Sequence, residues 1–264
     1  MGDSRIDPRA VVSPEAVLGS DVEIGPYAVV HANVEIGEGT VIYSHAVIRE
    51  GARIGRNCKI YNGAILSCDP QDPKFKGEDS RLYVGDGCSI GEYATLSKGT
   101  LAGGSQETRI GKDCLIMSLA HVGHDCIIGD RCTLTNGVQV AGHVVIGDES
   151  FLGGLVGISQ RTIIGRNVII GGLSKISKHV PPYTRVAAKW DIRFYEVNVM
   201  GLKMRDFPAE RIEEIRDAYR LLFKKGLLKK ERFEAVRGMK DFPEKKVILD
   251  FFEEIGSQPV VQPF

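Results

Sequence analysis

The chain has 264 residues, with 34 basic and 34 acidic side chains, so its formal net charge is zero. This balance argues against nucleic acid as the main partner, because nucleic-acid-binding proteins carry a basic surface. The sequence contains no long apolar run and no basic-then-apolar signal peptide, so we expect no membrane span and a cytoplasmic location.

An aliphatic residue recurs at every sixth position from the start of the chain. A period of six is neither helical nor that of a simple alternating strand, and it is typical of a parallel β-helix built from hexapeptide repeats. Three repeats make one triangular coil of about 18 residues, so side chains that far apart stack on adjacent coils. The first inward-facing positions are Ile6, Val12, Leu18, Ile24, Val30, Ile36, Ile42, Ile48, Ile54, Ile60 and Leu66.

Glycine and asparagine or aspartate mark the expected corners of the coils. Glycine often follows the inward residue, and Asn or Asp comes two residues later, as at Asn57, Asp113 and Asn167. These residue types tolerate the positive φ that a tight corner needs.

The sixfold register breaks twice. The polar, proline-containing segment 68–81 interrupts it before Val84, and we interpret this segment as a loop that replaces or leaves part of a coil. Loops that project from a rigid scaffold often carry function. The segment 101–108 shifts the frame by two residues, which would place Lys98 beneath Ser118.

The longest run then spans twelve consecutive positions: Ile110, Ile116, Val122, Ile128, Leu134, Val140, Ile146, Leu152, Ile158, Ile164, Ile170 and Ile176. Cysteine precedes an inward residue by two positions at Cys58, Cys88, Cys114, Cys126 and Cys132, a register that alanine takes in other coils. Because no CxxC pair occurs, we expect these cysteines to be small packing residues and not disulfides or metal ligands.

The repeat ends near residues 179–183, and the composition changes at about residue 191. We therefore expect a β-helix domain over residues 1–190 and a C-terminal helical domain over residues 191–264. The second domain would cover the end of the β-helix, where unpaired strand edges invite aggregation. Its apolar periodicity predicts helices at 208–226, 229–237 and 243–255.

Three of the six histidines lie close together in the longest run. The coil spacing places Gly142 over His124, His143 over Asp125, and Gln160 over Gly142. A neutral histidine, with a reference pKa of about 6.5, can take a proton from an attacking hydroxyl, and a carboxylate can fix its tautomer. A glycine N–H can approach a developing oxyanion. The group therefore favours acyl transfer in which an acceptor alcohol attacks directly.

The same histidines allow other interpretations. A zinc ion in a trimeric, non-catalytic hexapeptide protein would take as ligands His121, His124 and His143, and chelators would then inactivate the protein. Lone corner histidines are usually surface residues, and we interpret in this way His31, His45 and His179.

Two stretches of the longest run carry a more specific signal, LAHVGHDCIIGDRC (119–132) and VQVAGHVVIG (138–147). Four others accompany them: PQDPKFKGE (70–78), SKGT (97–100), VPPY (180–183) and VNVMGLKMRDF (197–207). With these motifs, the chain closely resembles the UDP-N-acetylglucosamine acyltransferases of lipid A biosynthesis over nearly its whole length. Many acyltransferases share the hexapeptide pattern, but this combination is specific.

The resemblance implies a left-handed parallel β-helix, a handedness that the usual right-handed crossover rule would not predict. It also implies a homotrimer with active sites between neighbouring subunits. The implied reaction moves an R-3-hydroxyacyl group from acyl carrier protein to the 3-hydroxyl of UDP-N-acetylglucosamine, the first step of lipid A and hence lipopolysaccharide biosynthesis. No metal or cofactor is expected.

Carried over by position, the resemblance makes His124 the general base, Asp125 the residue that orients it, and Gly142 the oxyanion donor. Gly172 falls where the family measures acyl length, and a glycine there would leave room for a long chain. Contacts with the sugar nucleotide or its phosphates are implied for Gln71, Asp72, Lys74, His121, His143, Gln160, Asn198 and Arg205.

The sequence departs from the family pattern in three places. Ser159 stands where the family usually has histidine, Met204 replaces the first of two basic residues, and AKWD (188–191) replaces a GNHA-like stretch. Ser159 and the AKWD stretch keep open a paralogous acyltransferase that acts on a different nucleotide sugar, for example on a 3-amino group to give an amide.

A basic stretch lies near the end of the repeat. Between Ile158 and Arg193 the only acid is Asp191. Such a stretch would steer the acidic acyl carrier protein, and acyl transfer would then slow as salt is added. Its seven basic residues are Arg161, Arg166, Lys175, Lys178, Arg185, Lys189 and Arg193.

Overall fold

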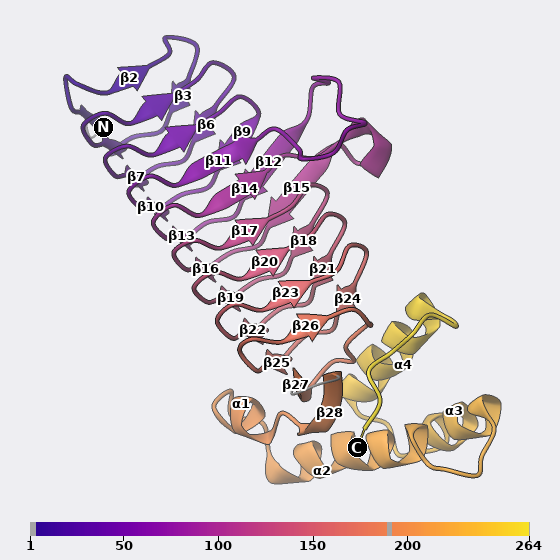
Figure 1. Cartoon of the computed structure of the whole chain (residues 1–264). Helices are drawn as coiled ribbons and strands as arrows, with labels where there is room; N and C mark the ends of the chain where they lie inside the picture. The colour runs from indigo at the N-terminus through magenta and orange to yellow at the C-terminus, as the bar shows by residue number, and fades with distance from the viewer. Residues whose placement is uncertain (1–3, 189–191, 264) are drawn as a thin grey trace.

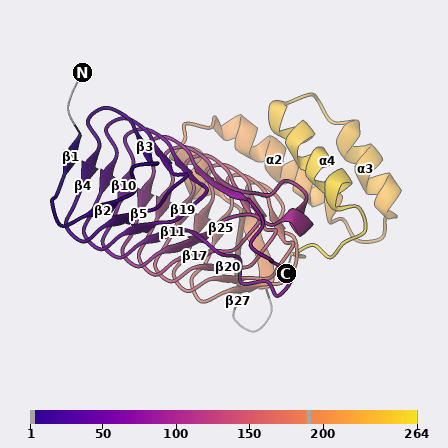
Figure 2. The same cartoon turned by 90° about the horizontal axis from the view of Figure 1, so that it is seen from above.

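The computed structural model describes residues 4–188 and 192–263. Short strands wind into a prism of stacked coils, and a group of helices lies at its C-terminal end (Figure 1). Viewed from above, the coils superimpose as nested turns (Figure 2). Neighbouring strands pair 18 residues apart in most coils, as Ile116 pairs with Leu134, so the coil length predicted from the sequence is confirmed.

Three sheets form the faces of the prism. The first sheet contains β1 (Arg5–Ile6), β4 (Glu23–Ile24), β7 (Val41–Ile42), β10 (Lys59–Ile60), β13 (Ser89–Ile90), β16 (Leu115–Ile116), β19 (Thr133–Leu134), β22 (Phe151–Leu152), β25 (Ile169–Ile170), β27 (Thr184–Ala188) and β28 (Ile192–Val197). The second contains β2 (Val11–Val12), β5 (Val29–Val30), β8 (Val47–Ile48), β11 (Ile65–Cys68), β14 (Thr95–Ser97), β17 (His121–Val122), β20 (Gln139–Val140), β23 (Gly157–Ile158) and β26 (Lys175–Ile176). The third contains β3 (Val17–Leu18), β6 (Glu35–Ile36), β9 (Ala52–Ile54), β12 (Arg81–Val84), β15 (Glu107–Ile110), β18 (Ile127–Ile128), β21 (Val145–Ile146) and β24 (Ile163–Ile164).

The predicted aliphatic positions fill the interior of the prism. From Ile24 to Ile176 they are buried, whereas Ile6 is 44% exposed because its coil is the first and has no coil before it to cover it. The five cysteines in the alanine register are buried free thiols, as predicted. Burial of these side chains supplies most of the stabilisation of strands that are too short to be stable alone.

The corners have the predicted backbone conformation. Asn57, Asp113 and Asn167 have φ values of 54°, 53° and 56°. Asparagine and aspartate tolerate this left-handed region better than most residues.

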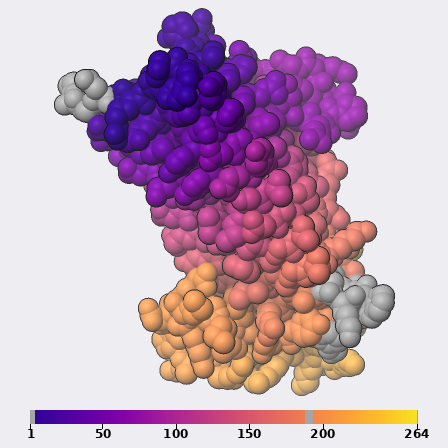
Figure 3. Space-filling model, turned by 60° about the vertical axis from the view of Figure 1, so that its left-hand side comes forward, coloured from indigo at the N-terminus to yellow at the C-terminus, as the bar shows by residue number. Residues whose placement is uncertain are grey.

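Both register breaks are insertions that leave the coil without replacing any of it. Leu66 pairs with Leu96, a spacing of 30 residues, so the first insertion adds 12 residues to the coil. Leu96 pairs with Val122, a spacing of 26, so the second adds eight and includes the short 3-10 helix η1 (Leu101–Gly103). The two insertions project from one side of the prism (Figures 1 and 3).

The expected position of Lys98 is therefore wrong. The frame shift is two residues, but the inserted length is eight, because a whole hexad is added as well. Ser118 lies over Glu92, whose carboxylate accepts a hydrogen bond from the serine hydroxyl. Lys98 pairs instead with Asp69 of the first insertion, with 3.2 Å between Nζ and Oδ1.

The C-terminal region begins with a hairpin. Strand β27 continues the first sheet, and β28 pairs with it antiparallel. The predicted helices are confirmed as α2 (Ala209–Leu222), α3 (Lys229–Arg237) and α4 (Pro243–Ile255), and the sequence did not predict the short α1 (Val199–Lys203). Tyr219 of α2 donates a hydrogen bond to the carbonyl of Pro182, which fixes the helices on the last coil. The division into two domains at residue 190 stays a prediction.

His179 is not a surface residue, contrary to the prediction, whereas His31 and His45 are exposed. The Nδ1 atom of His179 accepts from the N–H of Ile163, and its Nε2 atom lies 2.7 Å from Oε1 of Gln258. The ring thus links the last coil to the C-terminal tail. In the described part of the chain, no helix is long and apolar enough to cross a membrane.

Candidate active site

A cavity of about 780 Å³ lies on the outer face of the second sheet, beside the first insertion. Its walls come from both insertions, from the second-sheet strands β14, β17, β20, β23 and β26, and from the corners that follow β17, β20 and β23. Predicted site residues that line it are Gln71, Asp72, Lys74, His121, His124, Gly142, His143 and Gln160. The structure therefore brings together residues that lie up to 90 positions apart in sequence.

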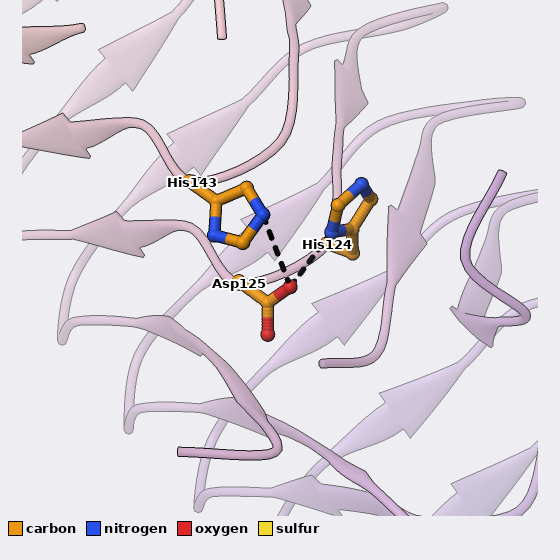
Figure 4. Close-up of side chains that lie close together, drawn as sticks. All are labelled: His124, Asp125 and His143. Carbon is orange, nitrogen blue, oxygen red and sulfur yellow. Dashed lines mark hydrogen bonds and ion pairs between the residues drawn. The ribbon is translucent and has the colours of Figure 1, made fainter. Parts of the chain in front are cut away.

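His124, Asp125 and His143 form the centre of the site (Figure 4). The Nδ1 atom of His124 lies 2.7 Å from Oδ2 of Asp125, and Nε2 of His143 lies 3.7 Å from the same oxygen. Because the carboxylate can only accept, Nδ1 of His124 carries a proton, and in the neutral ring the lone pair is then on Nε2. This is the tautomer that a general base requires.

Gly142 lies directly over the His124 ring, as the coil spacing predicts. A Cβ atom at Gly142 would lie 2.6 Å from Nε2 and from Cε1 of His124. Its N–H donates to none of the described residues, although its carbonyl accepts from the N–H of Arg161. An unpaired N–H beside the basic nitrogen is suited to binding an oxyanion.

The other two histidines of the group carry no charge at neutral pH. Burial lowers the pKa of His121, and the nearby His124 lowers it further. Burial also lowers the pKa of His143, more than Asp125 raises it. The Nδ1 atom of His121 lies 2.8 Å from the hydroxyl of Thr95 on the strand below. Neutral imidazoles in a cavity can both donate to and accept from sugar hydroxyls.

Three predicted residues lie outside this cavity. Gly172 is exposed and lies at the corner that precedes β26. This corner is at the edge of the second sheet opposite the corner that holds His124. Asn198 is buried and caps α1 by accepting from the N–H of Gly201. Arg205 pairs with Glu149 on a third corner, with 3.2 Å between Nε and Oε2.

The residues that could together bind a metal ion differ from the three histidines predicted as zinc ligands. The potential ligand atoms of His124, Asp125 and His143 lie within 4.8 Å of one another, and among the described residues this group does not include His121. Oδ1 of Asp125 already accepts from the N–H of Thr100, and Oδ2 accepts from its hydroxyl. These bonds favour an orienting carboxylate over a metal ligand.

Of the three departures, Ser159 lines the cavity and Met204 is exposed. Residues 189–191 of the third lie outside the described part of the chain. Sequence reasoning missed several residues of the site: Ser97, Thr100, Gln139 and Gly157. Of these, Ser97 and Thr100 belong to the SKGT motif. The position of this motif relative to His124 was not predicted, because the length of the second insertion was wrong.

The basic stretch carries less unpaired positive charge than its sequence indicates. Arg166 pairs with Asp148, and Arg185 pairs with Glu196, so acids from outside the stretch neutralise two of its cations. Arg161 and Lys175 line the cavity, and neither forms an ion pair with another described residue. Lys189 lies outside the described residues.

Comparisons with known proteins identify both parts of the chain. The family described as UDP N-acetylglucosamine O-acyltransferase, domain 2, matches residues 179–259. The family described as bacterial transferase hexapeptide, six repeats, matches residues 33–68 and 107–142.

Similar curated proteins cover almost the whole chain. An acyl-(acyl-carrier-protein)–UDP-N-acetylglucosamine O-acyltransferase from Chlorobaculum parvum is 59% identical over 94% of this chain and 94% of its own length. The enzyme of the same name from Chlorobaculum tepidum is 57% identical over 98% of both chains.

Solved structures with a similar fold also match nearly the whole chain. LpxA from Acinetobacter baumannii has a TM-score of 0.92 and 36% identity, over 97% of this chain and 99% of that one. The Francisella novicida UDP-N-acetylglucosamine acyltransferase has a TM-score of 0.91 and 37% identity, over 97% and 94%. The predicted left-handed parallel β-helix with C-terminal helices is confirmed. This chain is an acyltransferase and belongs to the UDP-N-acetylglucosamine O-acyltransferase family.

Proposed function

We propose that the chain transfers an R-3-hydroxyacyl group from acyl carrier protein to the 3-hydroxyl of UDP-N-acetylglucosamine, the first step of lipid A biosynthesis. The names of the similar enzymes support this donor and acceptor. The observation that carries the proposal is the Nε2 atom of His124, which keeps a free lone pair beside the unpaired N–H of Gly142.

His124 acts as the general base. Its Nε2 takes the proton of the acceptor hydroxyl while the hydroxyl oxygen bonds to the thioester carbon. The carboxylate of Asp125 holds the imidazole in this tautomer and stabilises the imidazolium as it forms. A general base of this kind contributes about 10²–10⁴-fold to the rate.

Gly142 stabilises the tetrahedral intermediate. The carbonyl oxygen becomes an oxyanion and accepts from the Gly142 N–H, which requires no side chain and no rearrangement. When the intermediate collapses, the carbon–sulfur bond breaks and the thiolate of the carrier protein leaves. His124 returns its proton to that sulfur, so the enzyme ends the cycle unchanged.

The walls of the cavity would hold the acceptor. Gln71, Asp72 and Lys74 of the first insertion face the corner that holds His143 and Gln160, with the cavity between them. We assign these residues, together with His121, to contacts with the sugar and its phosphates. A neutral His143 suits a hydroxyl partner better than a charged one would.

We propose a homotrimer whose sites lie between subunits. Asn198 and Arg205 lie on a different corner from His124, so a neighbouring copy could present them to the cavity. A row of apolar corner residues, each more than 60% exposed, would be buried by such contact: Tyr93, Leu119, Leu155 and Leu173. Light scattering should give three times the subunit mass, and a monomeric mass would contradict this assembly.

The acyl carrier protein would bind beside the open end of the cavity. Arg161 and Lys175 supply positive charge there that no described acid neutralises, which suits an acidic donor. We also propose a cytoplasmic location, since six free thiols suit a reducing compartment.

A transfer assay tests the function directly. The purified chain is mixed with R-3-hydroxyacyl carrier proteins of several chain lengths and with UDP-N-acetylglucosamine or its 3-amino analogue. We expect an ester product from the first acceptor. Transfer only to the amino analogue would instead identify the paralogous enzyme. Failure with both acceptors would contradict the proposal.

A further inference from the structure

The carboxylate of Asp125 is held by the second insertion. The N–H of Thr100 donates to Oδ1 at 2.8 Å, and the Thr100 hydroxyl donates to Oδ2 at 2.7 Å. Oδ2 is also the oxygen that accepts from Nδ1 of His124. Thr100 therefore contacts the same carboxylate oxygen as the base, and it does not itself line the cavity.

The direction of this hydrogen bond is fixed. The N–H of Gly103 donates to the Thr100 hydroxyl oxygen at 2.9 Å, so the hydroxyl proton must point to Asp125. A Cβ atom at Gly103 would overlap the carboxylate of Asp125, so any other residue there would displace that carboxylate. Thr100 is 1% exposed, and water does not compete for these bonds.

We propose that Thr100 is a positioning residue for the acyl-transfer reaction. It acts through Asp125: it holds the carboxylate in the plane in which His124 keeps its proton on Nδ1. This inference rests on the proposed role of His124 and assigns a function to the second insertion. Without the hydroxyl, the partners of Oδ2 among the described residues are His124 and the more distant His143, and the carboxylate is less firmly held.

Thr100→Val tests this role, since valine keeps the shape and the backbone N–H but removes the hydroxyl. We expect kcat to fall about 10- to 100-fold with little change in KM for the acceptor, as is usual for residues that orient a catalytic group. Thr100→Ser should restore most of the rate. Thr40→Val is the matched control, because Thr40 is buried and hydrogen-bonded but remote from the site.

A spectroscopic readout separates positioning from a merely structural effect. In protein labelled with 15N-histidine, His124, assigned by its loss in His124→Ala, should show the Nδ1–H tautomer in the wild type and a mixture in Thr100→Val. If Thr100→Val loses only thermal stability and keeps kcat and tautomer, the inference is wrong. Inactive wild-type protein would instead contradict the proposed function.

A second observation concerns Gly157, which is outward-facing on β23 between Gln139 and Lys175. A Cβ atom there would meet nothing within 4 Å, and its φ is not in the left-handed region. Neither packing nor backbone therefore requires glycine. Glycine weakens a strand, and it often marks a place where a ligand approaches closely.

We infer that Gly157 is a specificity-determining residue over which the acyl chain passes. It lines the cavity midway across the second sheet, between the corner of Gly142 and the corner of Gly172. The proposed mechanism places the acyl carbonyl at Gly142, and the resemblance implies that the chain ends at Gly172. A chain between these two corners crosses the second sheet at the position of Gly157. A side chain here would shorten the available path.

Gly157→Leu tests this path. We expect transfer from long-chain donors to fall at least tenfold relative to a four-carbon 3-hydroxyacyl donor, whose short chain makes the least use of this path. Thr133→Leu, an outward substitution on the first sheet, should leave the ratio unchanged. An equal loss for all donors, or dissociation of the assembly, would show that Gly157 packs against another copy and would overturn the inference.

Discussion

At the scale of single residues, the proposed acyl-transfer chemistry depends on how closely Gly142 approaches His124. The two are 18 positions apart, so the repeat places one on the other without any special contact between them. The same repeat brings His143 to 3.7 Å from Asp125. These placements could be predicted because the coil length is uniform here.

Gly142→Ala should abolish most of the activity. Its Cβ would lie 2.6 Å from Nε2 of His124, so the ring or the N–H has to move. Loss of an oxyanion donor costs about 10²–10³-fold in kcat, and we expect at least that in a transfer assay. Gly238→Ala, at a position with room for a methyl group, is the control and should keep wild-type kcat.

The lowered pKa values of His121 and His143 predict a pH dependence of stability. The unfolded chain takes up protons at about pH 6.5, whereas these folded histidines do so only at lower pH. The free energy of unfolding should therefore fall as the pH drops below about 6.5. Urea denaturation of His121→Gln at pH 7.0 and 5.5 should show a smaller fall than the wild type. Equal falls would contradict the assignment.

At the scale of elements, each strand depends on the coils above and below it. Strands of two residues form few hydrogen bonds, and the stacked aliphatic side chains hold them in place. The sequence predicted these strands because one face of every coil must be apolar. It did not predict α1, because five residues are too few to show a helical period. It did not predict the length of the insertions, because their polar residues do not repeat with any period.

Leu134→Ala tests the stacking. Leu134 is fully buried between Ile116 and Leu152, and the surrounding coils cannot collapse into the space it leaves. We expect a loss of about 2–5 kcal/mol in the free energy of unfolding. Thr133→Ala, outward on the same strand, should change it by less than about 0.5 kcal/mol. Similar losses in both variants would argue against a core set by the repeat.

At the scale of the whole molecule, the predicted site residues are distributed over three corners of the prism. One corner holds His124 and Gly142, another holds Gly172 beside exposed leucines, and the third holds Arg205. No periodicity in one chain could predict that Asn198 and Arg205 lie away from the cavity. Their predicted role depends on a second copy, which a single sequence does not describe.

Positive charge at the open end of the cavity predicts that the rate of acyl transfer depends on the salt concentration. Arg161 and Lys175 would attract the acidic donor over distances that salt screens, so kcat/KM for the carrier-protein thioester should fall between low and high ionic strength. Arg161→Gln should show a weaker dependence on salt. Rates that do not change with ionic strength would exclude steering by this surface.

The central claim is that His124 is the base that activates the acceptor hydroxyl. The most direct measurement is kcat of His124→Ala in the transfer assay with UDP-N-acetylglucosamine, with circular dichroism to confirm that the β-helix is intact. Because Nε2 of His124 is the only basic atom proposed to take the hydroxyl proton, we predict a loss of about 10²–10⁴-fold. A folded His124→Ala variant with near-normal kcat would contradict the mechanism.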